Sequence, residues 1–164
     1  MLLWFAYHDL YTPKWSNHIF DEWMDVMLRK GVPEPEAIKR TEAVNEAFPD
    51  ALVKNYEFLI KTLELPDDKD KHVLAAAIKT NANLIVTNNL KDFPEEYLSG
   101  FGLSAKEPDD FFTDIIDLNH DLSVRAFRDL VIMKKNPPYD EFHVLDIFRK
   151  NGLRNTADYL HSLI

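Results

Sequence analysis

Apolar and polar residues alternate along the chain with the spacing of amphipathic helices, interrupted by short apolar runs. Apolar residues between Ile19 and Met27 form one such stripe, and Ser16 before it is a favoured N-cap residue. The short run at 84–87 has the length and composition of a strand. The pattern predicts helices at 2–11, 17–29, 36–47, 57–63 and 73–80, and strands at 51–56, 84–87 and 103–106.

The second part of the chain has a different pattern, because after Pro108 every periodic segment is helical. Strands alternating with helices before that point favour a parallel α/β sheet. We therefore predict an α/β domain over residues 1–108 and a helical extension packed on it over residues 109–164. The extension is expected to contain helices at 110–117, 122–133, 141–150 and 156–163, with a break at 136–138.

Composition sets limits on function. The 164 residues are 46% apolar and 12% aromatic, enough for a real core. His8 and Asp9 break the N-terminal apolar run well before the roughly 20 residues that a bilayer helix needs. The absence of cysteine fits a cytoplasmic protein. A formal charge of −9 argues against a basic nucleic-acid-binding module. An acidic protein can still act on phosphodiesters if divalent metal neutralises its carboxylates.

Polar residues gather at the ends of two predicted elements that a fold could bring together. Asp70 precedes the Ala-rich helix at 73–80, and Asn89 and Asp92 follow the strand at 84–87. In open α/β sheets, ligands bind outside the carboxyl ends of the strands. These residues are therefore candidates for a site.

Each candidate also has a simpler structural interpretation. Glu22 stands beside the apolar stripe of its helix, and a boundary glutamate usually reaches solvent or pairs with a cation. Asp70 could simply cap the helix that follows it or lie in its first turn. The six histidines lack metal-ligand spacing and are taken as surface or packing residues. Four further residues could have no role beyond shaping exposed turns: Asp67, Asp68, Asn89 and Asp92.

The segments 15–23, 50–56, 65–78 and 85–94 together resemble PIN domains. More narrowly, they are similar to the branch that contains VapC-like toxins of bacterial toxin–antitoxin pairs. The likeness covers most of the chain and is most specific between Leu65 and Pro94. It implies a three-layer fold, in which helices flank a parallel sheet.

The resemblance also implies an activity, which is endoribonuclease cleavage with Mg²⁺ or Mn²⁺ held by three or four acidic residues. Glu22 and Asp70 resemble the second and third acids, and the fourth position falls at Asn89 or Asp92. The implied catalytic residues are thus Glu22, Asp70, Asn89 and Asp92, with Glu22, Asp70 and Asp92 as metal ligands. Lys14, Lys71 and Lys91 would provide local positive charge for RNA. The implied protein partner is a cognate antitoxin.

The chain departs from the family pattern at its start. A PIN domain normally opens with a buried strand that carries the first catalytic Asp, whereas Met1 begins where the first helix is already under way. Asp9 cannot substitute, because it lies near the far end of that helix. We therefore expect a missing or replaced first strand, weak or absent nuclease activity, and a homodimer that covers the exposed strand edges. The alternatives are a catalytically dead PIN-like binding module, or an α/β protein whose acidic cluster is only a capped turn.

Overall fold

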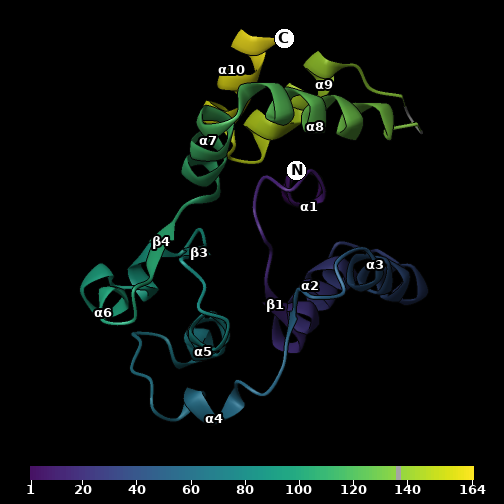
Figure 1. The fold of residues 1–164 in the computed structure, drawn as a ribbon. Helices are drawn as coiled ribbons and strands as arrows, with labels where there is room; N and C mark the ends of the chain where they lie inside the picture. Colours follow the sequence, from purple (N-terminus) through teal and green to yellow (C-terminus); the bar gives the residue numbers. More distant parts are fainter. Residues whose placement is uncertain (136–137) are drawn as a thin grey trace. The chain divides into compact units, whose positions relative to one another are not determined.

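The structure, a computed structural model, describes residues 1–135 and 138–164 (Figure 1). Asn136 and Pro137 of the predicted break therefore lie outside the described residues. The chain divides into two compact units, which are described separately below. Unit 1 comprises Met1–Thr12, Val86–Asn88 and Lys106–Ile164, and unit 2 comprises Pro13–Ile85 and Asn89–Ala105.

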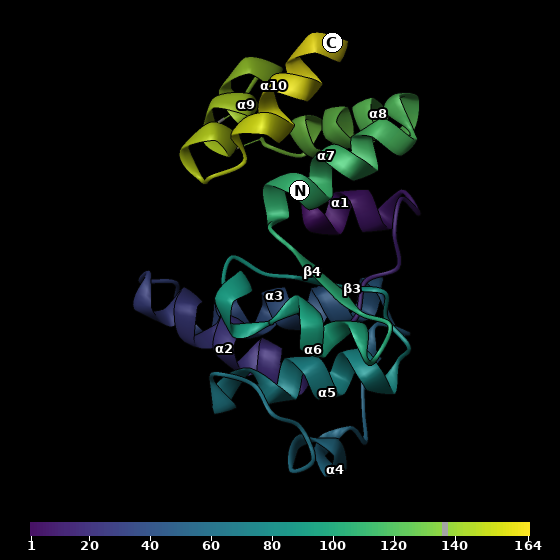
Figure 2. The ribbon, with the colours of Figure 1, turned by 90° about the vertical axis from the view of Figure 1, so that its left-hand side faces the viewer.

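Unit 2 contains short parallel strands among helices (Figure 2). Strand β1 (Trp15–Ser16) pairs in parallel with β2 (Leu52–Val53). Strand β3 (Leu84–Val86) pairs with β4 (Ser104–Lys106), and both strands continue into unit 1. The other elements are α2 (Asn17–Arg29), α3 (Glu34–Ala47), α4 (Glu57–Ile60), the 3₁₀ turns η1 (Asp68–Asp70) and η2 (Leu90–Asp92), α5 (Lys71–Lys79) and α6 (Glu95–Ser99).

The second strand pair is parallel as well, because its hydrogen-bond partners advance together along both strands. The amide of Ser104 donates to the carbonyl of Asn83 (3.2 Å), and that of Thr87 donates to Lys106 (3.0 Å). The predicted parallel α/β class is thus confirmed. The strands form two separate two-stranded ladders, however, and not one continuous sheet.

The core of unit 2 is built on α5. Leu74 and Ala75 are fully buried there, and they belong to the same apolar cluster as Val53 of β2 and Ile85 of β3. Alanine side chains are small, so a helix that presents them can pack closely against its neighbours. This packing fixes the start of α5, and with it the position of the acidic turn before the helix.

Unit 1 contains helices packed on one another: α1 (Leu2–Tyr7), α7 (Pro108–Leu118), α8 (His120–Ile132), α9 (Glu141–Lys150) and α10 (Arg154–Leu163). Helix α1 packs against α8. The ring centroids of Phe5 and Phe112 are 5.6 Å apart, and those of Phe127 and Phe148 are 6.0 Å apart. Edge-to-face aromatic contacts of this kind add to the energy of apolar burial. The helical interpretation of the chain after Pro108 is confirmed.

Several sequence-based boundaries were right and others were wrong. Helix α2 has the predicted bounds, because the Ser16 hydroxyl accepts from the Ile19 amide (3.3 Å) and caps it. The first helix ends at Tyr7, short of residue 11, and Tyr7 is exposed, so this helix is not buried all round. Val26 of the predicted stripe is also exposed. Helix α6 and strand β1 were not predicted, since elements this short leave no periodic signal.

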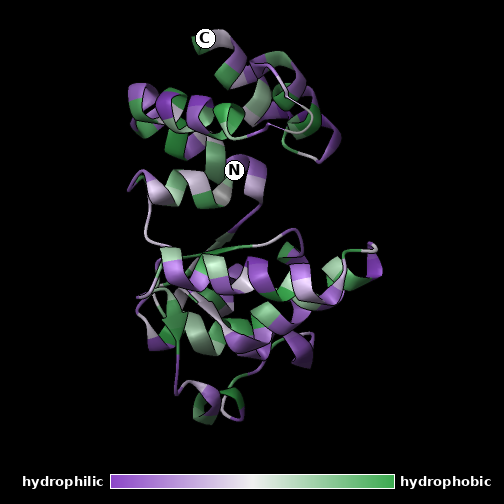
Figure 3. Cartoon of the chain, turned by 90° about the vertical axis from the view of Figure 1, so that its right-hand side faces the viewer, coloured by the Kyte–Doolittle hydropathy of each residue, from purple (hydrophilic) through white to green (hydrophobic). Residues whose placement is uncertain are grey.

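The helices carry hydrophilic as well as hydrophobic residues along their length (Figure 3). Within the part of the chain that the structure describes, every helix is too short or too polar to span a bilayer.

Candidate metal centre

Three carboxylates converge in unit 2. Asp67, Asp70 and Asp92 each place one oxygen so that all three atoms lie within 4.8 Å of one another. Asp67 and Asp70 bracket the turn η1 before α5, and Asp92 ends the turn η2 that follows β3. The ends of one helix and one strand thus bring together carboxylates that are distant in the sequence.

Asp70 occupies the N-cap position of α5, but its side chain makes no capping hydrogen bond. Burial raises the pKa of its carboxyl group above the usual range, and the charges of Asp67, Asp92 and Glu22 raise that pKa further, while His72 opposes the shift. A raised pKa means that the charged carboxylate is unfavourable in this environment. A cation bound at this point would relieve both the repulsion and the desolvation.

Asp92 and Asn89 have different places in the cluster, which the sequence could not separate. Asp92 is 9% exposed and contributes a carboxylate oxygen to the cluster. The side-chain amide of Asn89 donates a hydrogen bond to the Asp92 carboxylate. Asn89 therefore orients Asp92, in the way that outer partners commonly orient metal ligands.

Asp67 was interpreted from sequence as part of a solvated turn, and it is indeed exposed. One of its oxygens accepts from the Lys69 amide (2.9 Å), which stabilises η1. The same residue nevertheless contributes an oxygen to the three-carboxylate cluster. Sequence spacing gives no way to tell a turn-forming aspartate from one that also faces a distant carboxylate.

Glu22 lies outside the cluster of three but close enough to affect it. Glu22 contacts His72, which is two residues after Asp70 in the sequence, and its charge contributes to the raised pKa of Asp70. The side chain is 62% exposed, and its oxygen Oε1 lies 3.2 Å from His72 Nε2. Glu22 therefore reaches solvent, as the simpler interpretation expects, and the partner of its Oε1 is a histidine.

A group of three rings, which was not predicted from the sequence, lies beside Glu22. His72, on the first turn of α5, is only 8% exposed. Its ring centroid is 5.0 Å from that of His18, whose Nδ1 lies 2.9 Å from the Tyr56 hydroxyl. One signal was available, because His18 and Glu22 are four residues apart and so share one face of α2.

The chemistry of the cluster fits a hard divalent cation, because carboxylate oxygens are the ligands that Mg²⁺ and Mn²⁺ prefer. Two of the lysines expected to attract RNA are engaged elsewhere. Lys71 pairs with Asp68 (2.6 Å), and Lys14 donates to the Asp50 carbonyl (2.6 Å). The candidate centre is therefore strongly acidic in its immediate surroundings.

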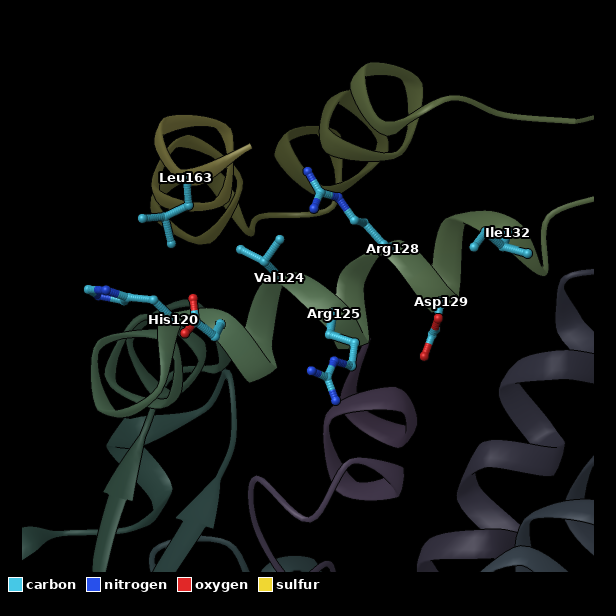
Figure 4. Close-up of a pocket in the computed structure, with 8 residues that line it drawn as sticks. His120, Val124, Arg125, Arg128, Asp129, Ile132 and Leu163 are labelled. Carbon is cyan, nitrogen blue, oxygen red and sulfur yellow. The ribbon is translucent and has the colours of Figure 1, made fainter.

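In unit 1, residues of α8 and Leu163 of α10 line an open groove (Figure 4). Val124 and Arg128 project from one side of α8, and Arg125 and Asp129 project from the opposite side. Arg128 pairs with Glu141 (2.9 Å) and Asp129 with His8 (2.9 Å). The lining of this groove therefore combines arginines with aspartates, unlike the three carboxylates of the cluster.

Comparison with known proteins gives two family matches in different parts of the chain. Residues 2–91 match the family described as PIN domain, and residues 108–162 match the VapC50 C-terminal domain. The chain is 35% identical over 113 residues to the protein named "Putative ribonuclease VapC50" from Mycobacterium tuberculosis. That alignment covers 69% of this chain and 66% of the relative, just under two thirds of its length. No solved structure gave a significant match.

Proposed function

Because this chain belongs to the PIN-domain family, we propose that it is a metal-dependent endoribonuclease of the VapC toxin type. Mg²⁺ or Mn²⁺ would bind at the three-carboxylate cluster, with Asp70 and Asp92 as direct ligands and Asp67 beside them. Glu22 would bind the ion directly or through water. Asn89 would hold the Asp92 carboxylate in its ligating orientation.

The observation that carries this proposal is the convergence of Asp67, Asp70 and Asp92, together with the raised pKa of Asp70. Carboxylates that only shape a turn would be expected to point apart into solvent or to pair with lysines. A bound divalent cation would supply charge neutralisation at a scissile phosphate and lower the pKa of a coordinated water. The chain's own acids would hold that ion, and Asn89 would fix the geometry of one of them.

The partners follow from the same proposal. RNA would be the substrate, and a cognate antitoxin would be the protein that restrains the activity. A domain boundary near residue 108 is supported by the two separate family matches, 2–91 and 108–162. A homodimer and a cytoplasmic location stay predictions of the sequence.

The test is cleavage of a structured RNA by the purified protein with Mn²⁺ or Mg²⁺, and with excess EDTA. We expect weak metal-dependent cleavage, which falls by about 100-fold or more in Asp70→Asn and in Asp92→Asn because each change removes a charge that binds the ion. Asp68→Asn is the matched control. Asp68 lies in the same turn but pairs with Lys71, so its loss should leave cleavage within about 2-fold of the wild type.

Equal cleavage by the wild type and the Asp70 and Asp92 variants would contradict the proposal. If the wild type binds Mn²⁺ but cuts no RNA, the catalytically dead binding module becomes the better description. If it neither binds Mn²⁺ nor cuts RNA, the acidic cluster is only a feature of the turn.

A further inference from the structure

We propose that His72 is a positioning residue, which holds the Glu22 carboxylate next to the three-carboxylate cluster so that a metal ion can recruit it. This inference rests on the proposed function and names a residue that the acidic pattern does not reveal. Its basis is the contact between His72 Nε2 and Glu22 Oε1 (3.2 Å), which joins α5 to α2 across 50 positions of sequence.

Glu22 has two reasons to leave the site when no ion is present. Asp67, Asp70 and Asp92 carry the same charge, and Glu22 acts unfavourably on at least one of them, Asp70. Its side chain is also 62% exposed, and an exposed glutamate keeps rotamer freedom worth up to about 2 kcal/mol. Something must therefore oppose both the repulsion and the entropy.

His72 provides a hydrogen bond that can oppose both the repulsion and the entropy. A carboxylate can only accept hydrogen bonds, so His72 Nε2 is the donor in the pair. The ring is 8% exposed and belongs to the first turn of α5, two residues after Asp70. Because α5 is anchored by fully buried Leu74 and Ala75, His72 has a fixed position relative to the cluster.

The orientation of the His72 ring is itself constrained. Its centroid lies 5.0 Å from that of His18, and His18 Nδ1 lies 2.9 Å from the hydroxyl of Tyr56. Tyr56 is 2% exposed and belongs to the apolar core of unit 2. A continuous series of contacts thus leads from the core to Glu22, with His18 and Glu22 on one face of α2.

The second nitrogen of His72 strengthens this assignment. Among the described residues, Nδ1 has no hydrogen-bond partner although it is buried. A buried polar atom without a partner costs free energy, so a histidine at this position is unfavourable unless Nε2 has a use. Holding Glu22 is the use that the structure shows, and outer hydrogen bonds of this kind typically change metal affinity by 10–100-fold.

The test is a double-mutant cycle measured by Mn²⁺ binding to the full chain, with calorimetry as the readout. His72→Phe removes the donor but keeps a ring, and we expect it to weaken Mn²⁺ binding by about 10-fold or more. In the Glu22→Gln background the same change should add less than about 2-fold, because the group that His72 holds is already lost. His72→Gln, which keeps an amide donor near the Nε2 position, should recover most of the affinity.

The matched control is His143→Phe in unit 1. His143 Nδ1 lies 2.9 Å from Asp140 Oδ1, so this histidine also contacts a carboxylate, but Asp140 is not part of the three-carboxylate cluster. This variant should bind Mn²⁺ like the wild type. Thermal unfolding of each variant shows whether it folds. If His72→Phe folds poorly, His72→Gln is compared with the wild type instead, both with and without Glu22→Gln.

The outcomes separate this inference from the proposed function. If the wild type binds Mn²⁺ and His72→Phe binds it equally well, only the role of His72 is overturned. If losses from His72→Phe and Glu22→Gln add fully, His72 acts on the site without acting through Glu22, and the inference also fails. If the wild type binds no Mn²⁺, the proposed function falls and this inference falls with it.

Discussion

Aspartates in the two units have opposite environments. In unit 1, Asp140 caps α9 and accepts from the His143 amide (2.8 Å). That hydrogen bond has the largest effect on the pKa of Asp140 and lowers it below its usual value. The hydrogen bond from the His143 side chain lowers the same pKa further. In unit 2, burial and three neighbouring acids raise the pKa of Asp70. The same side chain is therefore stabilised as an anion in one unit and destabilised in the other.

Asp109 extends the pattern of unit 1. Its two oxygens accept from the amides of Asn155 (2.9 Å) and Thr156 (2.8 Å) at the start of α10, and from the Thr156 hydroxyl (2.7 Å). Asp109 and Asp140 thus stabilise helix ends through hydrogen bonds within unit 1. In unit 2 the pKa of Asp70 is raised instead, and under the proposed function a bound cation would neutralise the cluster.

The largest effect that would test this comparison is the loss of an aspartate from unit 1. Asp109→Ala should lower the free energy of unfolding by about 2–3 kcal/mol, because it removes a cap and leaves the buried Thr156 hydroxyl without that acceptor. Urea denaturation measures it. Asp110→Ala, at the next and exposed position, should cost less than about 1 kcal/mol. Similar losses in both variants would mean that Asp109 is not an important cap.

Added metal should produce an effect of comparable size in unit 2. At a Mn²⁺ concentration of about 100 times the dissociation constant, the free energy of unfolding should rise by about 2.7 kcal/mol. Asp92→Asn should abolish most of this gain, because it removes a ligand of the ion. Asp140→Asn should keep the full gain even though the variant starts from a lower stability. A metal-induced gain that survives Asp92→Asn would place the ion elsewhere.

The smallest effect has the opposite sign and depends on pH. Without metal, Asp70→Asn should raise stability at neutral pH by up to about 1 kcal/mol, since it removes a partly buried charge and its repulsion by neighbouring acids. A raised folded-state pKa means that Asp70 favours the folded state most at pH below its unfolded value and loses this contribution as pH rises through the folded-state pKa. The advantage of Asp70→Asn should therefore vanish in acid.

Asp140 should show the reverse dependence, which makes it the control for this measurement. Its folded-state pKa is lowered, so its contribution is present above the unfolded pKa and is lost as pH falls through the folded pKa. Asp140→Asn should thus be destabilised at neutral pH and approach the wild type in acid. If the stability of both variants, relative to the wild type, changed with pH in the same direction, the proposed difference between the two units would be wrong.

Local signals in the sequence were sufficient for part of the fold. Ser16 fixed the start of α2, and the run around Ile85 identified β3, because capping and apolar length act within a few residues. The shortness of α1 and the exposure of Val26 could not be predicted in this way. Both depend on which neighbours pack against the helix, and those neighbours are distant in sequence.

The same limit applies to the candidate site. The order of Asp70, Asn89 and Asp92 along the chain indicated where carboxylates would gather, and the structure places them together. Periodicity could not show that His72 reaches Glu22, since that contact requires α5 to lie beside α2 in the folded unit. Nor could it separate Asp67, which joins the cluster, from Asp68, which pairs with Lys71.

The helix–strand hairpin formed by α5 and β3 supplies all three of the converging carboxylates, from turns at its two ends. Most of the candidate centre is accordingly encoded in one uninterrupted piece of gene. Such a continuous segment could be exchanged between related proteins as one unit, because its three acids would keep their spacing. The recipient would have to provide an apolar core that receives Leu74 and Ala75, and an α2-like helix with counterparts of His18 and Glu22.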